Sequence, residues 1–325
     1  MANAVLRLNF VQPDIDAKQL SARYKAGLEM ARFADKHGFM SVTLEEHHGA
    51  DDGWSPAPLA TAAAILASTE RVGVMLMALL VPLHDPLRIA EDIAVIDLLS
   101  GGRLMVVGGL GYRPEEYAAH QKDWKGRGKL MDECVAALLG AWTGEPFEYR
   151  GETVKVTPAP LTKPHPPFFI GGTSKPSVRR AIKFNLPIFF AAPVPELKAY
   201  YEELQAETGA QGFAMMPEGN FSHHWIAEDP DKAWAEFGHH LFHEAWTYHS
   251  WQTDDIKSAV HSSATTVEEL RAEGMYTIIT PDEAIALAKA DPAFMFNFHP
   301  MVGGMPIDTA WETLQLWEDK VLPNI

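Results

Sequence analysis

The chain has 325 residues, of which 47% are hydrophobic and 22% are charged, so it can bury a sizeable core as one large domain or two ordinary ones. It carries 43 acidic and 27 basic residues, and the resulting net charge of −16 disfavours nucleic acid and anionic membranes as partners. A single cysteine, Cys134, excludes an internal disulfide and suits a reducing compartment. Its helical spacing with apolar neighbours predicts that it lies in the core.

The sequence carries no pattern typical of export or membrane insertion. Residues 1–4 lack the basic and apolar regions of a secretory signal. The most apolar stretch, 72–83, is too short to cross a bilayer and contains Pro82. We therefore expect a cytoplasmic protein.

Short apolar runs alternate with amphipathic stretches along the first two thirds of the chain. The apolar runs predict strands at 4–10, 39–44, 71–81, 104–107, 167–170 and 186–191. Apolar residues at helical spacing predict helices at 16–36, 58–68, 86–99 and 127–142. The strands lack polar alternation, which is typical of a parallel sheet covered on both faces.

The last third of the chain is less regular. The seventh and eighth strands are predicted at 225–227 and 294–298, and residues 147–157, with Gly151 at the turn, predict a hairpin. Eight βα units in a chain of this length favour an α/β fold of the (β/α)₈ TIM-like barrel type over a doubly wound sheet. We expect one domain over 1–325, with a hairpin insertion near 145–166 and a longer insertion near 240–290.

The end of the second predicted strand is the first candidate for chemistry, because active sites of such barrels lie at the carboxyl ends of the strands. Glu45, Glu46, His47 and His48 follow that strand. An imidazole there could act as acid, base or hydrogen-bond donor, and a carboxylate could fix its tautomer. Adjacent histidines on extended backbone point to opposite sides, so one of the two should face the barrel mouth. The alternative is a solvated polar strand end.

The fifth predicted strand is followed by Gly171, Gly172, Thr173 and Ser174. Glycines allow close approach of the backbone to a ligand, and a capped helix that begins there would offer its first N–H groups to a phosphate. The alternative is an ordinary capped turn between a strand and a helix.

Two other sequence patterns do not qualify as binding sites. The glycines at 108–111 fail the G-x-G-x-x-G spacing, because Pro114 stands where the third glycine belongs, so we expect no nicotinamide-dinucleotide turn. His239 and His243 have an i, i+4 spacing that can hold a metal, but no cluster of carboxylates or cysteines completes a ligand set. The sequence therefore predicts no metal site.

Five runs, in order over nearly the whole chain, resemble the luciferase-like monooxygenases. They are residues 46–48, 81–88, 97–103, 109–117 and 320–323. The run that ends at Arg103 is the most specific of them. The resemblance implies a TIM-like barrel with an insertion, usually dimeric, that binds reduced FMN or the deazaflavin F420 at the barrel mouth.

The same resemblance assigns roles to individual residues. His47 matches the catalytic histidine of bacterial luciferase, which is the first histidine of its Glu-His-His run. The family commonly has a non-prolyl cis peptide bond beneath the flavin ring, and the spacing from Pro82 puts it at Met77-Ala78. The cofactor-binding residues that we expect are Glu46, Met77, Ala78, Tyr112, Gly171, Gly172, Thr173 and Ser174. One departure is Leu110, where bacterial luciferase has an arginine; Arg113 could supply the missing cation.

Three functions stay open at this point. The first is a monooxygenase that uses reduced FMN and O₂ on a small, hydrophobic organic molecule, with a separate flavin reductase as supplier and His47 as the acid–base group. The second is hydride transfer with F420, and the third is a catalytically silent flavin-binding subunit, which the presence of His47 disfavours. The luciferase-like Glu-His-His run favours FMN. An aromatic set suits a hydrophobic substrate: Phe10, Trp54, Trp246, Trp251 and Phe298.

Overall fold

The computed structural model describes residues 3–14, 16–217, 222–252, 256, 258 and 260–325. Met1 and Ala2 therefore lie outside the described residues. The central strands are β1 (Asn3–Leu8), β2 (Ser41–Leu44), β3 (Gly73–Leu80), β4 (Leu104–Gly109), β7 (Phe168–Gly171), β8 (Ile188–Phe189), β9 (Ala214–Met215), β10 (His223–Ile226), β11 (Tyr276–Ile279) and β12 (Met295–Phe298).

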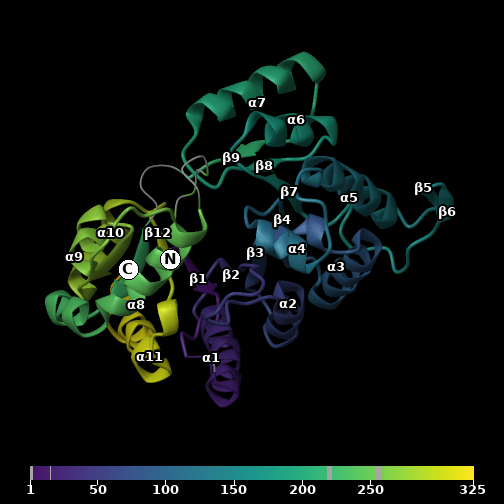
Figure 1. The fold of residues 1–325 in the computed structure, drawn as a ribbon. Coiled ribbons are helices and arrows are strands. Elements are labelled where there is room, and N and C mark those ends of the chain that lie inside the picture. Colours follow the sequence, from purple (N-terminus) through teal and green to yellow (C-terminus); the bar gives the residue numbers. More distant parts are fainter. Residues whose placement is uncertain (1–2, 15, 218–221, 253–255, 257, 259) are drawn as a thin grey trace.

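These strands form one ten-stranded sheet in the order β11-β10-β12-β1-β2-β3-β4-β7-β8-β9, and the neighbouring strands pair in parallel. The α-helices are α1 (Ala17–Lys36), α2 (Pro58–Ala67), α3 (Pro86–Ser100), α4 (Pro114–Ala119), α5 (Arg127–Trp142), α6 (Lys175–Lys183), α7 (Pro195–Thr208), α8 (Pro230–Trp251), α9 (Val267–Glu273), α10 (Pro281–Ala290) and α11 (Ile307–Leu316). Parallel strands that alternate with outer helices form the barrel that the sequence predicts (Figure 1).

The second half departs from the prediction in detail. Only Ile188 and Phe189 of the predicted strand 186–191 form β8. β11 lies beyond β10 in the sheet, although the sequence placed its residues within a long insertion. That stretch of the chain also contains most of α8, and all of α9 and α10. The structure describes 240–252, 256, 258 and 260–290 of it. The division into one domain with these insertions stays a prediction.

The hairpin between α5 and β7 consists of β5 (Phe147–Tyr149) and β6 (Glu152–Val154), which pair antiparallel. Its two turn residues, Arg150 and Gly151, have φ of 51° and 87°. Two positive φ angles are typical of the tight turn whose twist matches that of the flanking strands. The hairpin projects from the barrel on the side opposite to α8–α11 (Figure 1).

The most specific sequence run, 97–103, serves the fold at the amino ends of the strands. The Arg103 guanidinium donates to the backbone oxygens of Leu66, Thr69 and Val72 at distances of 2.8 to 2.9 Å. It thereby holds the end of α2 against the start of β3.

Cys134 is buried, which confirms its predicted place in the core. Burial raises the pKa of its thiol to about 11.

Two surface features bear on partners. Val95, Leu98 and Leu99 of α3 are 51%, 45% and 57% exposed, which is unusual for aliphatic residues on one helix.

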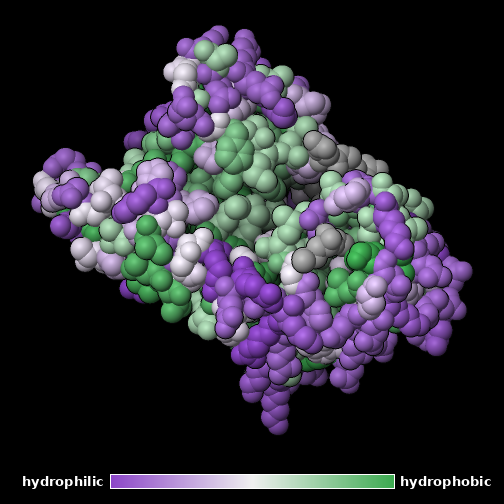
Figure 2. All heavy atoms as spheres, turned by 180° about the vertical axis from the view of Figure 1, so that it is seen from behind, coloured by the Kyte–Doolittle hydropathy of each residue, from purple (hydrophilic) through white to green (hydrophobic). Residues whose placement is uncertain are grey.

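None of the described helices is both long enough and apolar enough to cross a bilayer. On the face opposite to the view of Figure 1, apolar surface gathers around a hollow near the middle of the molecule, whereas the outer parts are hydrophilic (Figure 2).

Candidate active site

His47 lies just beyond the carboxyl end of β2 and is 6% exposed. Its Nδ1 is 3.1 Å from Oε1 of Glu116 on α4, and its Nε2 is 3.4 Å from the hydroxyl of Tyr112. An ionised carboxylate can only accept, so the imidazole donates from Nδ1 and keeps a lone pair on Nε2. Nδ1 of the imidazole is therefore fixed as a hydrogen-bond donor, whereas Nε2 can take up a proton.

Glu116 contacts three groups around the active-site histidine through one carboxylate oxygen. The same Oε1 accepts the backbone N–H of His48 at 2.9 Å and lies 3.3 Å from Nη1 of Arg113. Burial alone would raise the pKa of Glu116, but the hydrogen bond from His47, with the His48 N–H and the charge of Arg113, holds it below its ordinary value. The carboxylate thus stays ionised in a site where it is only 1% exposed.

Aromatic rings enclose the imidazole. The ring centroids of Trp251, Trp54, Tyr112 and Tyr248 lie 4.8, 5.4, 5.7 and 6.1 Å from that of His47. The Arg113 guanidinium covers the Trp251 ring at 4.1 Å, a cation–π distance. These walls exclude water from the imidazole and strengthen the electrostatic contacts that it makes.

A buried polar network supports the aromatic walls from inside the barrel. Arg7 of β1 pairs with Glu45, and it also pairs with Glu244 of α8 at 2.8 Å. Glu45 accepts hydrogen bonds from the Trp54 indole at 3.2 Å and from the Tyr248 hydroxyl at 2.9 Å. Both rings that flank His47 are therefore anchored to one ion pair.

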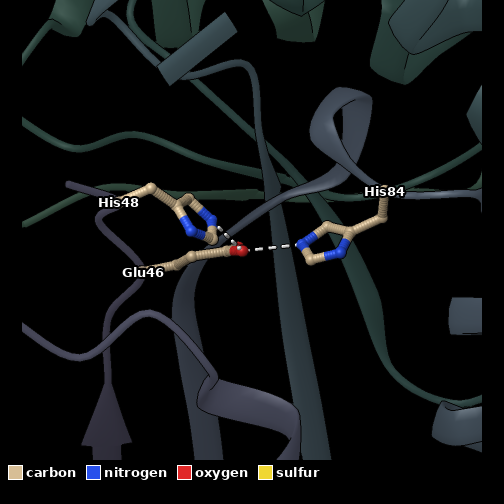
Figure 3. Close-up of side chains that lie close together, drawn as sticks. All are labelled: Glu46, His48 and His84. Carbon is tan, nitrogen blue, oxygen red and sulfur yellow. Dashed lines mark hydrogen bonds and ion pairs between the residues drawn. The ribbon is translucent and has the colours of Figure 1, made fainter. Parts of the chain in front are cut away.

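Glu46 points away from this cluster. One carboxylate oxygen accepts the backbone N–H of Leu80 at 2.6 Å, and the other lies 2.9 Å from Nε2 of His48 and 2.6 Å from Nε2 of His84 (Figure 3). Burial would raise the pKa of Glu46, but these hydrogen bonds lower it to about 2. Glu46 and His48 thus lie on one side of the strand end, whereas Glu45 and His47 lie on the other.

Known proteins share this architecture and part of this sequence. The family description "Luciferase-like monooxygenase" matches residues 1–304. The chain belongs to the luciferase-like monooxygenase family. The resemblance inferred from the sequence and the barrel fold are thereby confirmed.

Individual relatives span different chemistries. The FMNH(2)-dependent dimethylsulfone monooxygenase of Pseudomonas putida is 28% identical over 200 residues, which cover 58% of this chain and 54% of that protein. The chain thus matches about half the length of such curated relatives. The oxygenating constituent of 3,6-diketocamphane monooxygenase from Pseudomonas putida, solved in complex with FMN, is 19% identical, with a TM-score of 0.68 and coverage of 100% and 99%. An F420-dependent secondary alcohol dehydrogenase is 16% identical, with a TM-score of 0.64 and the same coverage. At these identities the two solved structures show the fold alone.

The residues expected to hold a flavin in this family lie along adjacent strand ends. The non-prolyl cis peptide bond is at Met77-Ala78 in β3, the position that the resemblance indicates. An added Cβ on Gly109 of the neighbouring β4 would come within 2.7 Å of Ala78 Cβ, so the two backbones are as close as a glycine allows. Met77, Ala78 and Tyr112 remain half-buried and reachable by a ligand.

The predicted phosphate turn follows β7, next to β4 in the sheet. Ser174 caps α6 and forms a reciprocal capping box with Ser177. Gly172 has a φ of 140°, and a Cβ there would lie 3.0 Å from Ser177 Cβ, so this position requires glycine. The positive end of α6, with the exposed Ser174 and Lys175 beside it, favours a phosphate group. These residues fit the tail of FMN or F420.

Other residues singled out in the sequence have different places. Phe10 and Phe298 are fully buried core residues, and Trp246 is 47% exposed on α8, so of the predicted aromatic set only Trp54 and Trp251 surround His47. His243 contacts Asp52 at 2.9 Å, and the exposed His239 has its ring tilted against that of His240, so the i, i+4 pair converges on no common ligand.

Glu116, Tyr248 and Glu244 were missed by sequence reasoning. Glu116 lies inside the run 109–117, where its proximity to the end of β4 could have assigned it to the barrel mouth. Nothing in the sequence connects α8 to His47, because that helix lies about 200 residues away and within the presumed insertion. For those two residues only the fold reveals the role.

Proposed function

We propose that this chain is the oxygenating component of a two-component flavin monooxygenase that acts on a small, apolar organic molecule. The observation that carries the proposal is the His47 imidazole, held by the ionised Glu116 inside an aromatic enclosure, after a strand whose neighbour β3 contains the cis peptide bond. The similarity to an FMNH(2)-dependent monooxygenase supports reduced FMN as the cofactor. A separate flavin reductase would supply it, since the chain lacks a dinucleotide-binding turn.

Reduced FMN supplies, when bound, the electrons for reaction with O₂. Ser174 and the start of α6 would hold its phosphate, and Met77, Ala78 and Tyr112 would contact the rest of the cofactor. Glu46 would act indirectly: its carboxylate accepts the backbone N–H of Leu80 and so positions the end of β3. His47 is the catalytic residue in this proposal: its Nε2 takes up or returns a proton beside the Tyr112 hydroxyl, while Glu116 keeps Nδ1 protonated. Trp54 and Trp251 keep the site dry.

Hydride transfer with F420 is the second candidate, because an F420-dependent dehydrogenase shares the fold over the whole chain. His47 would then exchange a proton with the substrate. A silent flavin-binding subunit would have no use for a histidine fixed by a buried carboxylate, so the geometry disfavours that third reading.

Anaerobic fluorescence titrations with reduced FMN, oxidised FMN and F420 test the choice of cofactor. We expect micromolar binding of reduced FMN, about tenfold tighter than that of oxidised FMN, a difference of about 1.4 kcal/mol. Micromolar binding of F420 without binding of reduced FMN would make the enzyme a hydride-transfer oxidoreductase. His47→Ala should lower turnover about 10²- to 10⁴-fold at unchanged cofactor affinity, whichever cofactor is used.

We further propose that the chain is cytoplasmic and forms a homodimer through α3. The exposed aliphatic residues Val95, Leu98 and Leu99 lie within five positions on one helix, and a second copy would remove them from water.

A further inference from the structure

Three metal-ligating side chains converge at the carboxyl ends of β2 and β3, outside the His47 cluster. The Glu46 carboxylate, Nε2 of His48 and Nε2 of His84 offer one ligand atom each, and these atoms lie within 4.8 Å of one another. Figure 3 shows both imidazoles directed at one carboxylate oxygen, from the loop after β2 and from the segment after β3. The arrangement brings together residues 38 positions apart.

In the described part of the chain, imidazoles rather than a lysine or arginine accompany the Glu46 carboxylate. Its side chain is 0% exposed, and the basic groups that lie within 4 Å of it there are those of His48 and His84. A buried carboxylate is costly unless a positive charge accompanies it. A lysine or arginine fills this role elsewhere in the molecule, as Arg7 does for Glu45 and Glu244.

His120 adds a second, independent observation. It follows α4, its ring centroid lies 4.4 Å from that of His48, and its Nδ1 is buried with no hydrogen-bond partner among the described residues. An imidazole nitrogen that is out of water and unpaired lacks the partner that buried polar atoms normally have. It lies beside the cluster rather than within it, because the ligand atoms within 4.8 Å of one another are those of Glu46, His48 and His84. A shift of its ring would be needed to make it a fourth ligand.

We propose that Glu46, His48 and His84 bind a divalent transition metal of the Zn²⁺ type, and that His120 shifts toward it to fill the fourth position of a tetrahedral site. Two or three imidazoles with one carboxylate form a donor set suited to Zn²⁺. Ligand bonds of about 2.0 to 2.1 Å put tetrahedral ligands about 3.3 Å apart. The 2.6 and 2.9 Å contacts at Glu46 therefore need to open by about 0.7 and 0.4 Å.

A metal at this site would have a structural role. It would tie the loop that carries His47 to the segment after β3 and to the end of α4, whose Glu116 orients the same histidine. The second cluster of this kind, His223, Glu244 and His299, does not qualify. Arg7 Nη1 lies 2.7 Å from His223 Nε2 and 2.8 Å from Glu244 Oε1, so a guanidinium already supplies the cation there.

The experiment uses the full chain without flavin, so it is independent of the proposed function. Protein treated with a chelator is titrated at pH 7.5 with Zn²⁺ by calorimetry and with Co²⁺ by absorption spectroscopy. We expect one equivalent to bind with micromolar or lower Kd, tetrahedral Co²⁺ bands, and a higher melting temperature with Zn²⁺. Binding should weaken as the pH falls, since metal and protons compete for imidazole nitrogen.

His84→Ala is the main variant, because His84 is the most exposed of the three ligands and its loss disturbs the core least. We expect it to weaken Zn²⁺ binding at least 100-fold, and His120→Ala at least about tenfold. His239→Ala, at an exposed histidine outside the cluster, is the control and should bind as the wild type does. Millimolar Kd values in the wild type, or equal loss in His239→Ala and His84→Ala, would overturn the proposal and leave a hydrogen-bonded cluster.

Discussion

Oε1 of Glu116 is shared by Nδ1 of His47, at 3.1 Å, and the backbone N–H of His48, at 2.9 Å. One carboxylate oxygen therefore fixes the direction of the imidazole and the path of the backbone that carries it. Because the oxygen belongs to α4 and the histidines follow β2, the contact joins the strand ends of β2 and β4 across the mouth. The tautomer of His47 follows from this contact.

Replacing Glu116 tests that relationship. Glu116→Gln keeps the size of the side chain but introduces an amide that can donate as well as accept, so Nδ1 of His47 is no longer obliged to hold the proton. We expect turnover to fall roughly 10- to 100-fold, less than in His47→Ala. Nitrogen-15 NMR of the imidazole should show a mixture of tautomers. Glu115→Gln, at the exposed neighbouring position, is the matched control. An unchanged tautomer together with normal turnover would remove Glu116 from the site.

Ser174 offers a clean test of the phosphate turn. Asp and Asn cap helices about as well as Ser, so Ser174→Asp and Ser174→Asn should both preserve α6. Only the aspartate adds a negative charge beside a bound phosphate, and we expect the Kd for reduced FMN or F420 to rise about tenfold in that variant alone. Fluorescence titration measures both. Equal affinities would mean that the phosphate binds elsewhere.

The dimer prediction depends on α3. Leu99→Glu puts a charge within the exposed aliphatic set, and burial of an unpaired charge opposes association. We expect light scattering to report a dimer for the wild type and a monomer for this variant. Trp246→Glu replaces an apolar residue with similar exposure, 47%, on α8, which lies on the other side of the molecule from α3 (Figure 1), and should leave the mass unchanged. A wild-type monomer at micromolar concentration would contradict the proposal.

His224 predicts acid sensitivity of the fold. Burial lowers its pKa to about 4, and its Nδ1 accepts the backbone N–H of Asn297 at 3.2 Å, which a protonated ring could not do. The unfolded chain therefore binds a proton below about pH 6.5 while the folded chain does not until about pH 4. The free energy of unfolding should fall across that window by up to about 3 kcal/mol.

Urea unfolding of the wild type and of His224→Asn between pH 7.5 and 4.5 measures this contribution. Asparagine keeps an acceptor for the Asn297 N–H but does not titrate, so the variant should lose stability less steeply on acidification. Other buried histidines are common to both proteins, and their effect cancels in the difference. Parallel curves for the two proteins would show that His224 does not titrate in this range.

The first half of the barrel could be predicted because its strands are predominantly apolar and each helix keeps a clear apolar stripe. The prediction 71–81, for example, contains all of β3. β8 and β9 have two residues each, which is too short for any periodic pattern. β11 was missed because its pairing partner, β10, lies about 50 residues earlier, and pairing at that distance leaves no local signal.

The site residues show the same contrast between local sequence signals and long-range packing. His47, Met77-Ala78 and the turn at 171–174 could be found because each directly follows a recognisable strand. Glu244 and Tyr248 could not, since their position depends on how α8 packs against β1 and β2. The convergence of His84 and His120 on Glu46 and His48 likewise joins segments whose proximity only the fold determines.

Residues 45–48 alternate between two environments: Glu45 and His47 contact the aromatic enclosure, and Glu46 and His48 contact His84. A single inserted or deleted residue in this run would exchange the two sets and destroy both at once. Substitutions, by contrast, affect one set at a time. Over evolutionary time a lineage could thus retune its chemistry through positions 45 and 47 while it conserves positions 46 and 48, or discard the latter pair and keep the reaction.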